Sequence, residues 1–188
     1  MNSMITSVRG NTAEGDIAGR DINKIYNSAR PITVMARLVD QYQSESAADR
    51  TLLEWSEKLE HFFSNKTNTD IRSLKEKLVS SGRGYMVDAA LMKKQSAWKA
   101  IMRQQGSRAA QTIYTFLLAE IVVNFEQSVL PLVQASASPE VIDAAMLEKV
   151  ISPALEMLES NPLMLNKLDI QGLVYFLAGN CHIRWDPC

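Results

Sequence analysis

Two cysteines and two histidines are the side chains best suited to metal or covalent chemistry, and three of these four lie near the C-terminus. Cys181 and His182 are adjacent, whereas Cys188 and His61 stand apart from them. A structural zinc site takes four ligands, usually in spaced pairs, and neighbouring residues do not easily face one ion. A cysteine–histidine nucleophile pair normally comes from separate elements with a third orienting group. We therefore expect no metal, no cofactor and no catalytic residue, and interpret His182 as a packed or capping side chain.

The glycines Gly10 and Gly15 have the first spacing of a phosphate-binding loop, whose pattern continues with Lys and then Ser or Thr. In this sequence Asp16 follows the second glycine instead. A carboxylate at that position would repel a phosphate, and no lysine is in place to attract one. The sequence therefore argues against nucleotide binding by this loop.

Acidic side chains are plentiful, but Glu54, Glu57 and Glu60 follow the spacing of a solvated helix face. A small metal-dependent hydrolase, one alternative function, would need two or three carboxylates that converge in a cleft. Asp88 and Glu120 are the residues whose replacement would test that alternative. No spacing in the sequence requires such a site, so we expect a protein without enzymatic activity.

The most basic patch is formed by five side chains that follow one another with Trp98 among them: Lys93, Lys94, Lys99, Arg103 and Arg108. Basic side chains beside an aromatic ring can hold single-stranded nucleic acid, so an accessory nucleic-acid-binding protein is a second alternative. The formal net charge is −1, from 20 basic and 21 acidic residues. Because no overall field attracts a polyanion, we do not expect direct nucleic-acid binding.

The elements that must position these side chains are helices over residues 31–188, so the fold class is mainly α, a helical bundle. Apolar residues with helical spacing follow Pro31, and further helices are expected from a cap at Asp49, over 70–79 and over 85–105. Ser107 is expected to begin a long helix that Pro131 kinks or ends. Ser138 and Pro139 begin the next helix, with a possible break at Pro153.

The last predicted helix covers residues 170–178, with Asp169 as its cap and Gly179-Asn180 as its end. This helix contains Tyr175 and Phe176, and Arg184 and Trp185 follow shortly after it; these residue types are enriched in binding hot spots. One interpretation makes the turn from 181 to 185 an exposed knob for a partner. The other is that Trp185 closes the core of its own domain. The predicted partner-binding residues are Tyr175, Phe176, Asn180, His182, Arg184 and Trp185.

The first 30 residues differ in composition, since they contain Gly10, Gly15 and Gly19 and only scattered apolar residues. Glycine before Asp is turn chemistry, and single β-branched residues between turns indicate very short strands. A lone hairpin is marginal in water, so this β-type segment is either flexible or completed by other copies of itself. The second interpretation predicts a homo-oligomer assembled through seven residues: Gly15, Asp16, Ile17, Gly19, Arg20, Asp21 and Ile22.

The sequence predicts a soluble, cytoplasmic protein. Its N-terminus lacks the basic head and apolar core of a signal peptide, and two cysteines do not make a disulfide framework. Four polar residues interrupt the longest apolar stretch, 113–133: Glu120, Asn124, Glu126 and Gln127. A buried amphipathic helix explains that stretch better than a membrane span, which needs roughly 20 mostly apolar residues.

The stretch from Leu173 to Trp185, Leu-Val-Tyr-Phe-Leu-Ala-Gly-Asn-Cys-His-Ile-Arg-Trp, resembles the C-terminal signature of proteins in bacterial ABC-three-component conflict systems of the Lamassu-like kind. The segment from Gly15 to Ile22 also resembles short Gly-Asp segments at the start of several bacterial defence proteins. In those systems an unusual ABC ATPase works with a small middle component and an effector, and many effectors end in a helical interaction domain.

The resemblance implies a helical interaction domain, a role in defence against phage or plasmids, and an ABC ATPase or effector of the same operon as the partner. Effectors of this kind usually carry an enzyme ahead of the helical domain. Only about thirty residues precede the first predicted helix, which puts an effector enzyme in doubt. We therefore expect a non-enzymatic adaptor or scaffold subunit.

Overall fold

The computed structural model describes residues 33–46, 54–64, 72–158 and 160–185. The chain divides into two units, Met1–Thr33 and Val34–Cys188. The seven residues predicted to drive oligomerisation lie in the first unit and outside the described residues. The second unit is mainly helical in its described part, as the sequence predicted, with no strand among those residues.

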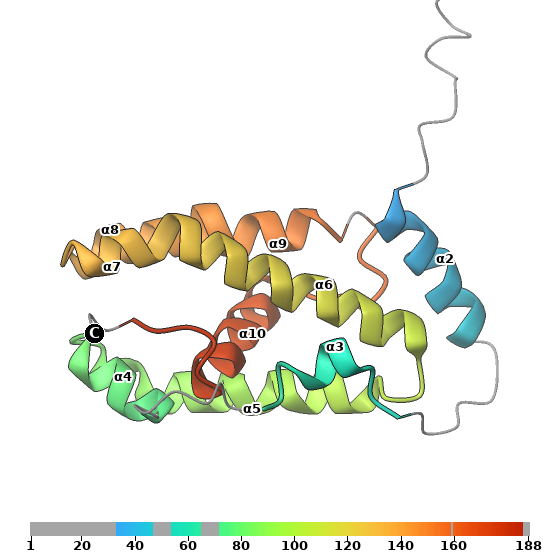
Figure 1. Cartoon of the computed structure of the whole chain (residues 1–188), viewed down its shortest axis with the longest axis horizontal. Coiled ribbons are helices and arrows are strands. Elements are labelled where there is room, and N and C mark those ends of the chain that lie inside the picture. The colour runs from blue at the N-terminus through green and yellow to red at the C-terminus, as the bar shows by residue number, and fades with distance from the viewer. Residues whose placement is uncertain (1–32, 47–53, 65–71, 159, 186–188) are drawn as a thin grey trace, which may run out of the picture. The chain divides into compact units, whose positions relative to one another are not determined.

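Two long antiparallel helical runs and one central helix form this unit. The first run consists of α6 (Arg108–Asn124), the π-helical segment η2 (Phe125–Val129) and α7 (Leu130–Gln134). The second consists of α8 (Pro139–Ala145), the π-helical segment η3 (Met146–Ile151) and α9 (Ser152–Glu156). Figure 1 shows α10 (Lys167–Gly179) between these runs and α5 (Val87–Arg103), and it packs against both.

Shorter helices complete the unit around this centre. Both α2 (Val34–Ser46) and α3 (Glu57–Glu60) pack on α6. The helix α4 (Leu74–Ser80) and the single 3₁₀ turn η1 (Gly84–Met86) pack on α5. These elements bring the segments around residues 60 and 80 close to the C-terminal end of α10.

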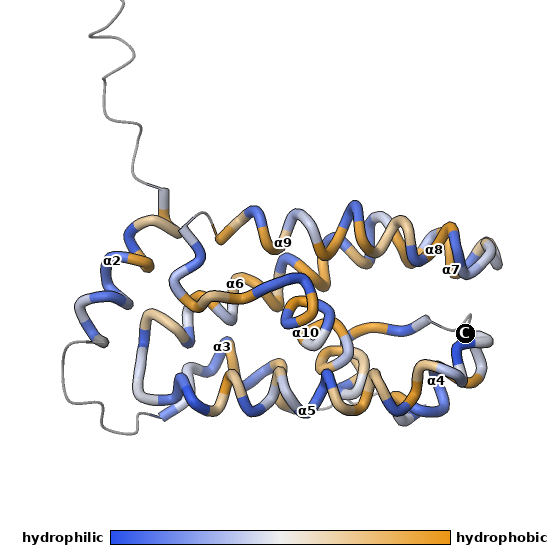
Figure 2. The backbone as a smooth tube through the Cα atoms, turned by 180° about the vertical axis from the view of Figure 1, so that it is seen from behind, coloured by the Kyte–Doolittle hydropathy of each residue, from blue (hydrophilic) through white to orange (hydrophobic). Residues whose placement is uncertain are grey.

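The helix α10 is the core of the domain. From Ile170 to Ala178 every residue is buried except Gln171, which is half-buried. A helix that is hydrophobic all round belongs inside a protein, and Figure 2 shows hydrophobic residues along α10 and into the stretch that follows it. Gly172 permits the close approach to α5, because a Cβ added there would lie 2.8 Å from the carbonyl oxygen of Lys93.

Caps explain where several helices begin. Ser107 begins α6 as predicted, since its side chain accepts a hydrogen bond from the amide of Ala110. The prediction that Asp169 caps α10 is wrong: Asn166 is the cap, and α10 begins at Lys167. The Asn166 side chain accepts from the third helical amide, and the Asp169 carboxylate accepts in return from the Asn166 amide at 2.8 Å. Asp169 is therefore the third residue of a capping box.

The predicted helix over residues 49–63 is much shorter than expected. Asp49 lies outside the described residues, and the observed helix α3 has four residues with Ser56 as its cap. The backbone just before α3 bonds to side chains of α6 instead of to itself. The Ser56 amide donates to Gln111 Oε1 at 2.9 Å, and Arg108 Nη1 donates to the Glu54 carbonyl at 2.7 Å. These tertiary bonds compete with a longer helix.

Prolines do not end the long helices. Pro131 was predicted to kink or end the first run, yet that run continues to Gln134, and Pro153 lies inside the second run. Each proline follows a π-helical segment, where the Leu130 amide bonds to the carbonyl five residues earlier rather than four. Proline lacks an amide hydrogen and clashes with the carbonyl four residues before it. The wider π turn accommodates both problems.

One helix among the described residues, the run Arg108–Gln134, is long and apolar enough to cross a membrane by length and composition alone. A third of its most apolar window, 33%, is buried inside the domain. The core helix of a soluble protein passes the same test, so this finding is weak, and the location of the protein stays a prediction.

Candidate functional site

The structure places the six predicted partner-binding residues at the centre and at one end of α10. Four of them, Tyr175, Phe176, His182 and Trp185, are buried, and Asn180 and Arg184 are half-buried. The turn from 181 to 185 is therefore not an exposed knob. The alternative interpretation, in which Trp185 closes the core of its own domain, describes its position, since the side chain is 5% exposed and packs beside Phe125 and Tyr175.

The turn that follows α10 is held by a buried lysine. Lys77 of α4 is 1% exposed, and its Nζ donates to the Ala178 carbonyl at 2.6 Å and to the Ile183 carbonyl at 3.4 Å. The Cys181 sulfur lies 3.5 Å from the same nitrogen, and Cys181 has a positive φ of 63°. A cation beside the last carbonyls of a helix also opposes the negative end of its dipole. This lysine clamp fixes the C-terminal turn.

Two further hydrogen bonds tie the turn to the segment after α3. Asn180 Nδ2 donates to the Phe62 carbonyl at 2.9 Å, and His182 Nε2 lies 3.3 Å from the Ser64 carbonyl oxygen. The His182 ring also packs against Phe62, with the ring centroids 5.4 Å apart. His182 is thus a packed residue bonded to backbone, in agreement with the prediction for it.

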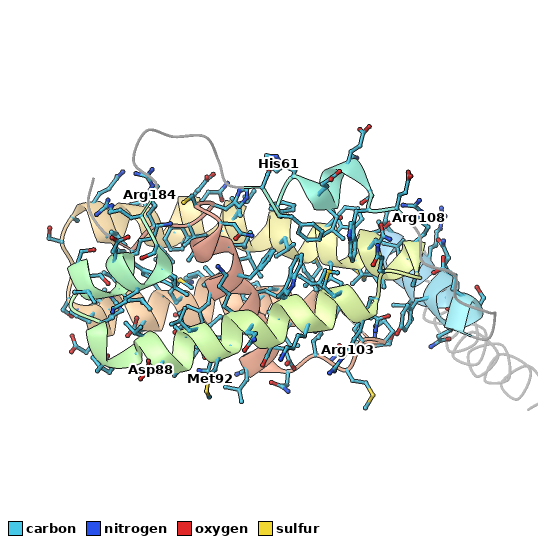
Figure 3. All side chains as sticks on the ribbon, turned by 90° about the horizontal axis from the view of Figure 1, so that it is seen from below. His61, Asp88, Met92, Arg103, Arg108 and Arg184 are labelled. Atoms are coloured by element: carbon cyan, nitrogen blue, oxygen red, sulfur yellow. The ribbon has the colours of Figure 1, made fainter. Side chains whose placement is uncertain are left out.

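The basic residues of the predicted patch differ in their surroundings. Lys93 donates to Gln171 Oε1 at 2.6 Å, and Arg108 donates to the Glu54 carbonyl. Lys94 is half-buried, and that burial lowers the pKa of its ammonium. Figure 3 shows Arg103 and Arg108 directed to different sides of the domain. Trp98, the aromatic residue of the patch, stacks on Phe176 and is 37% exposed.

The carboxylates of the hydrolase alternative lie on different helices. Asp88 is exposed at the start of α5, and Glu120 on α6 accepts a hydrogen bond from Asn124 at 2.8 Å. Within the described residues, no three His, Cys, Asp or Glu side chains come together as a possible metal site.

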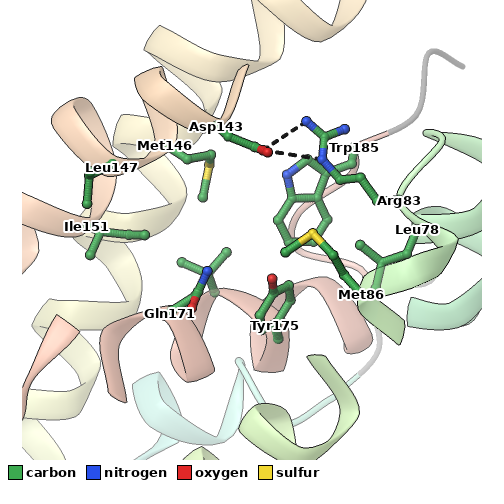
Figure 4. Close-up of a pocket in the computed structure, with 11 residues that line it drawn as sticks. Leu78, Arg83, Met86, Asp143, Met146, Leu147, Ile151, Gln171, Tyr175 and Trp185 are labelled. Atoms are coloured by element: carbon green, nitrogen blue, oxygen red, sulfur yellow. Dashed lines mark hydrogen bonds and ion pairs between the residues drawn. The ribbon is translucent and has the colours of Figure 1, made fainter. Parts of the chain in front are cut away.

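A pocket of about 240 Å³ lies where α4, η1, η3, α8 and α10 meet beside the C-terminal turn. Figure 4 shows its side chains, which come from residues as far apart in sequence as 78 and 185. Most of them are apolar, including Leu78, Met86, Met146, Leu147, Ile151 and Val174. Tyr175 and Trp185, two of the predicted partner-binding residues, form its inner wall.

An ion pair forms the polar edge of this pocket. Arg83 donates to Asp143 Oδ1 from Nη2 at 2.9 Å and from Nε at 3.2 Å, and Nη2 also donates to the Pro139 carbonyl. The Arg83 side chain is 3% exposed, whereas that of Asp143 is 47% exposed. The Arg83 guanidinium is therefore a buried positive charge, and its partner, the Asp143 carboxylate, is partly exposed to solvent.

The pKa of the Tyr175 hydroxyl lies above its ordinary value. Burial is the main cause that raises the pKa of this phenol; the Asp143 carboxylate raises it further, and the Arg83 guanidinium opposes the rise. A phenol carries its proton near neutral pH even at its ordinary pKa, so Tyr175 is a hydrogen-bond donor there.

The pocket was not predicted from the sequence. Arg83 and Asp143 are 60 residues apart, and neither belongs to a recognisable motif. The only signal was the cluster of aromatic residues at the end of the sequence, which predicted Tyr175 and Trp185 as important but not the side chains facing them.

A second, more open hollow of about 430 Å³ lies between α3 and α6. Its floor is apolar, and charged residues stand at its edge. The residues that line it are Glu57, Lys58, His61, Phe62, Thr115 and Ala119.

The fold and these sites define, in the described part of the chain, a helical domain with a clamped C-terminal turn and a small apolar pocket. A model of the family described as C-terminal domain 9 of the ABC-three component (ABC-3C) systems matches residues 73–185. This match covers more than half of the chain, so the chain belongs to that family, and the resemblance inferred from the sequence is confirmed.

The matched range begins at Ser73, the cap of α4, and ends at Trp185, so it contains both the lysine clamp and the pocket. The comparison with curated proteins gives no match, and neither does the comparison with solved structures.

Proposed function

We propose that this chain is a non-enzymatic interaction subunit of a bacterial ABC-three-component defence system, and that it docks the ABC ATPase or the effector of the same operon in the cytoplasm. The family match over residues 73–185 carries the proposal. Membership of that family supports partners from the same system, and it supplies no catalytic role for this chain.

The fixed C-terminal turn of the domain supports a role in docking a partner protein. The last turn is fixed by the buried Lys77 and by two hydrogen bonds to the segment after α3, so the surface around it is preorganised. A preorganised surface loses less conformational freedom on binding. The formal charge near balance favours contact with protein over contact with a polyanion.

The proposal is tested by co-expression of the full chain with the ABC ATPase and with the effector encoded beside it. We expect one of them to elute with this chain as a single complex in size-exclusion chromatography. Separate elution of all components, at concentrations where each is folded, would contradict the proposal.

A role in immunity needs its own test. Deletion of the gene from an active operon is expected to abolish protection against a phage that the intact operon restricts, measured as plaque number. Protection that survives the deletion would show that the system works without this subunit.

A further inference from the structure

The pocket beside the C-terminal turn has the size of a socket for one side chain. Its volume is about 240 Å³, whereas pockets for cofactors and drug-sized ligands are typically about 300–1,000 Å³. Met86 and Met146 stand on opposite sides of it, and methionine side chains adapt readily to the shape of an apolar guest. The walls therefore suit one large apolar side chain.

Two donors face into this space without an acceptor. Tyr175 and Trp185 are 4% and 5% exposed, and no described residue accepts a hydrogen bond from the Tyr175 hydroxyl or from the Trp185 indole N–H. Figure 4 shows the hydroxyl and the indole nitrogen directed at the space between Gln171, Met146 and Asp143. Buried donors are nearly always paired, so the pocket is complementary to a ligand that supplies an acceptor.

The rim offers an acceptor as well. Both hydrogen bonds that Asp143 accepts from Arg83 end on Oδ1, and Asp143 Oδ2 accepts none from the described residues. Because Arg83 compensates the charge of Asp143, the site favours a neutral ligand that has both a donor and an acceptor. A main-chain amide is such a group, whereas a free carboxylate lacks the donor and an ammonium lacks the acceptor.

We propose that this pocket is the docking socket for a peptide segment of the partner protein, which inserts one large apolar side chain and places a main-chain amide between Asp143 and the two ring donors. The inference rests on the proposed function and specifies the residues through which docking takes place. It also gives Tyr175 and Trp185 a role in binding from inside the pocket rather than from an exposed knob.

The socket is tested on the full chain with a small probe, N-acetyl-L-phenylalanine N-methylamide, which carries one aromatic side chain and two amides. The sequence has three tryptophans, Trp55, Trp98 and Trp185, so a ¹⁵N-labelled sample gives three indole signals. Trp55→Phe and Trp98→Phe variants assign the first two signals and leave the third for Trp185. We expect the probe to shift the Trp185 signal saturably and to leave the other two in place.

Two control measurements separate the side chain from the amides. The glycine analogue of the probe has the same amides without the aromatic group and is expected not to saturate at the same concentrations. The Tyr175→Phe variant keeps the ring and loses only the donor, so we expect the probe to bind about fivefold or more weakly. An unmoved Trp185 signal, or equal shifts of all three signals, would overturn the inference.

A matched pair of variants tests whether the pocket binds the partner protein itself. Leu147→Glu puts a charge on the rim of the pocket, whereas Leu168→Glu puts the same charge on an exposed leucine outside it. We expect Leu147→Glu to lower affinity for the partner at least tenfold and Leu168→Glu to leave it unchanged. If both variants bind like the parent, the socket is wrong and the proposed function stands; if the parent itself binds neither partner, the proposed function fails.

Discussion

Lys77 shows how a single charged residue can hold a segment far away in the sequence. Its Nζ meets two carbonyls and a sulfur of the C-terminal turn, about a hundred residues further along. We predict that Lys77→Met lowers the free energy of unfolding by about 2–4 kcal/mol, because the buried carbonyls lose their donor. The exposed neighbour Lys75→Met should stay within about 0.5 kcal/mol of the parent.

Urea unfolding followed by tryptophan fluorescence, to which Trp185 of the turn contributes with Trp55 and Trp98, measures the stability of the Lys77 and Lys75 variants. Equal stability of the Lys77 variant and the parent would show that the clamp contributes nothing. This contact could not be predicted from the sequence, because a lysine on an amphipathic helix is expected at the surface and only the tertiary packing buries it.

The raised pKa of Tyr114 indicates how the free energy of unfolding changes at alkaline pH. Burial is the main cause that raises the pKa of this phenol, and Asp169 and Tyr42 add to the rise. The unfolded chain releases the phenolic proton near pH 10, before the folded chain does, so the stability from this group is present below pH 10 and is lost as the pH rises above it. We expect Tyr114→Phe to reduce the loss of stability between pH 8 and pH 10.5.

The pH experiment compares urea midpoints of the parent and of Tyr114→Phe at the two pH values. Lys94 has a lowered pKa and acts in the opposite direction, but it is present in both proteins, so the difference between them isolates the tyrosine. Identical changes in the two proteins would contradict the prediction.

At the scale of elements, Gly172 decides how closely α10 approaches α5. A Cβ at this position would lie 2.8 Å from a backbone oxygen of α5, which no side-chain movement can relieve. We predict that Gly172→Ala destabilises the domain by about 1–3 kcal/mol, although alanine favours a helix by about 1 kcal/mol over glycine. The midpoint of thermal or urea unfolding measures the change.

Gly84→Ala is the matched control for Gly172→Ala. A Cβ at Gly84 would make only an ordinary contact, 3.7 Å from a side-chain carbon of Val79. This variant should be neutral or slightly more stable than the parent. A loss of stability at Gly84 as large as that at Gly172 would mean that the close crossing of the helices is not the cause.

The helix ends that were predicted correctly are set by residues at those ends. Ser107, Pro139 and Gly179-Asn180 sit at the ends of helices where the sequence placed them. Ser138 precedes α8 as predicted, but its side chain makes no bond to a helix amide and instead lowers the pKa of Glu140. Caps and stops depend on neighbouring residues, which is why their positions could be predicted.

The short helix α3 and the two π-helical segments could not be predicted in the same way. Bonds from Gln111 and Arg108 of α6 set where α3 begins, and those partners lie more than fifty residues away. The π turns before Pro131 and Pro153 resolve a conflict between a proline and a continuing apolar face. Tertiary packing decided that conflict, and the local pattern alone indicated a kink or an end.

At the scale of the whole molecule, the main prediction is that the first 30 residues drive the assembly of a homo-oligomer. We expect light scattering to give a defined oligomer for the full chain and a monomer for a chain that begins at Pro31. That outcome would assign assembly to the Gly-Asp-Ile segment. Monomers in both cases would refute the homo-oligomer and leave the helical domain as the part that binds partners.

The candidate site depended on the whole fold, which limits what the sequence could show. The aromatic residues near the end of the chain predicted part of it, and the family resemblance followed from the same stretch. Arg83, Asp143 and Met146 became visible only when α4, α8 and η3 met around α10. A pocket lined from several separated elements has no spacing that a sequence pattern can record.

The position of α10 along the chain has a consequence for synthesis in the cell. The helix α10, against which α5, α6 and α9 pack, follows all of them in the sequence. The lysine clamp also needs Ile183, which comes after α10. When the chain up to Glu156 has left the ribosome, the central helix α10 is therefore still missing, and the earlier helices cannot pack against it. Folding of this domain must follow translation of its last segment, and nonsense mutations in that segment should behave as full losses of the protein, through degradation of the unfolded product.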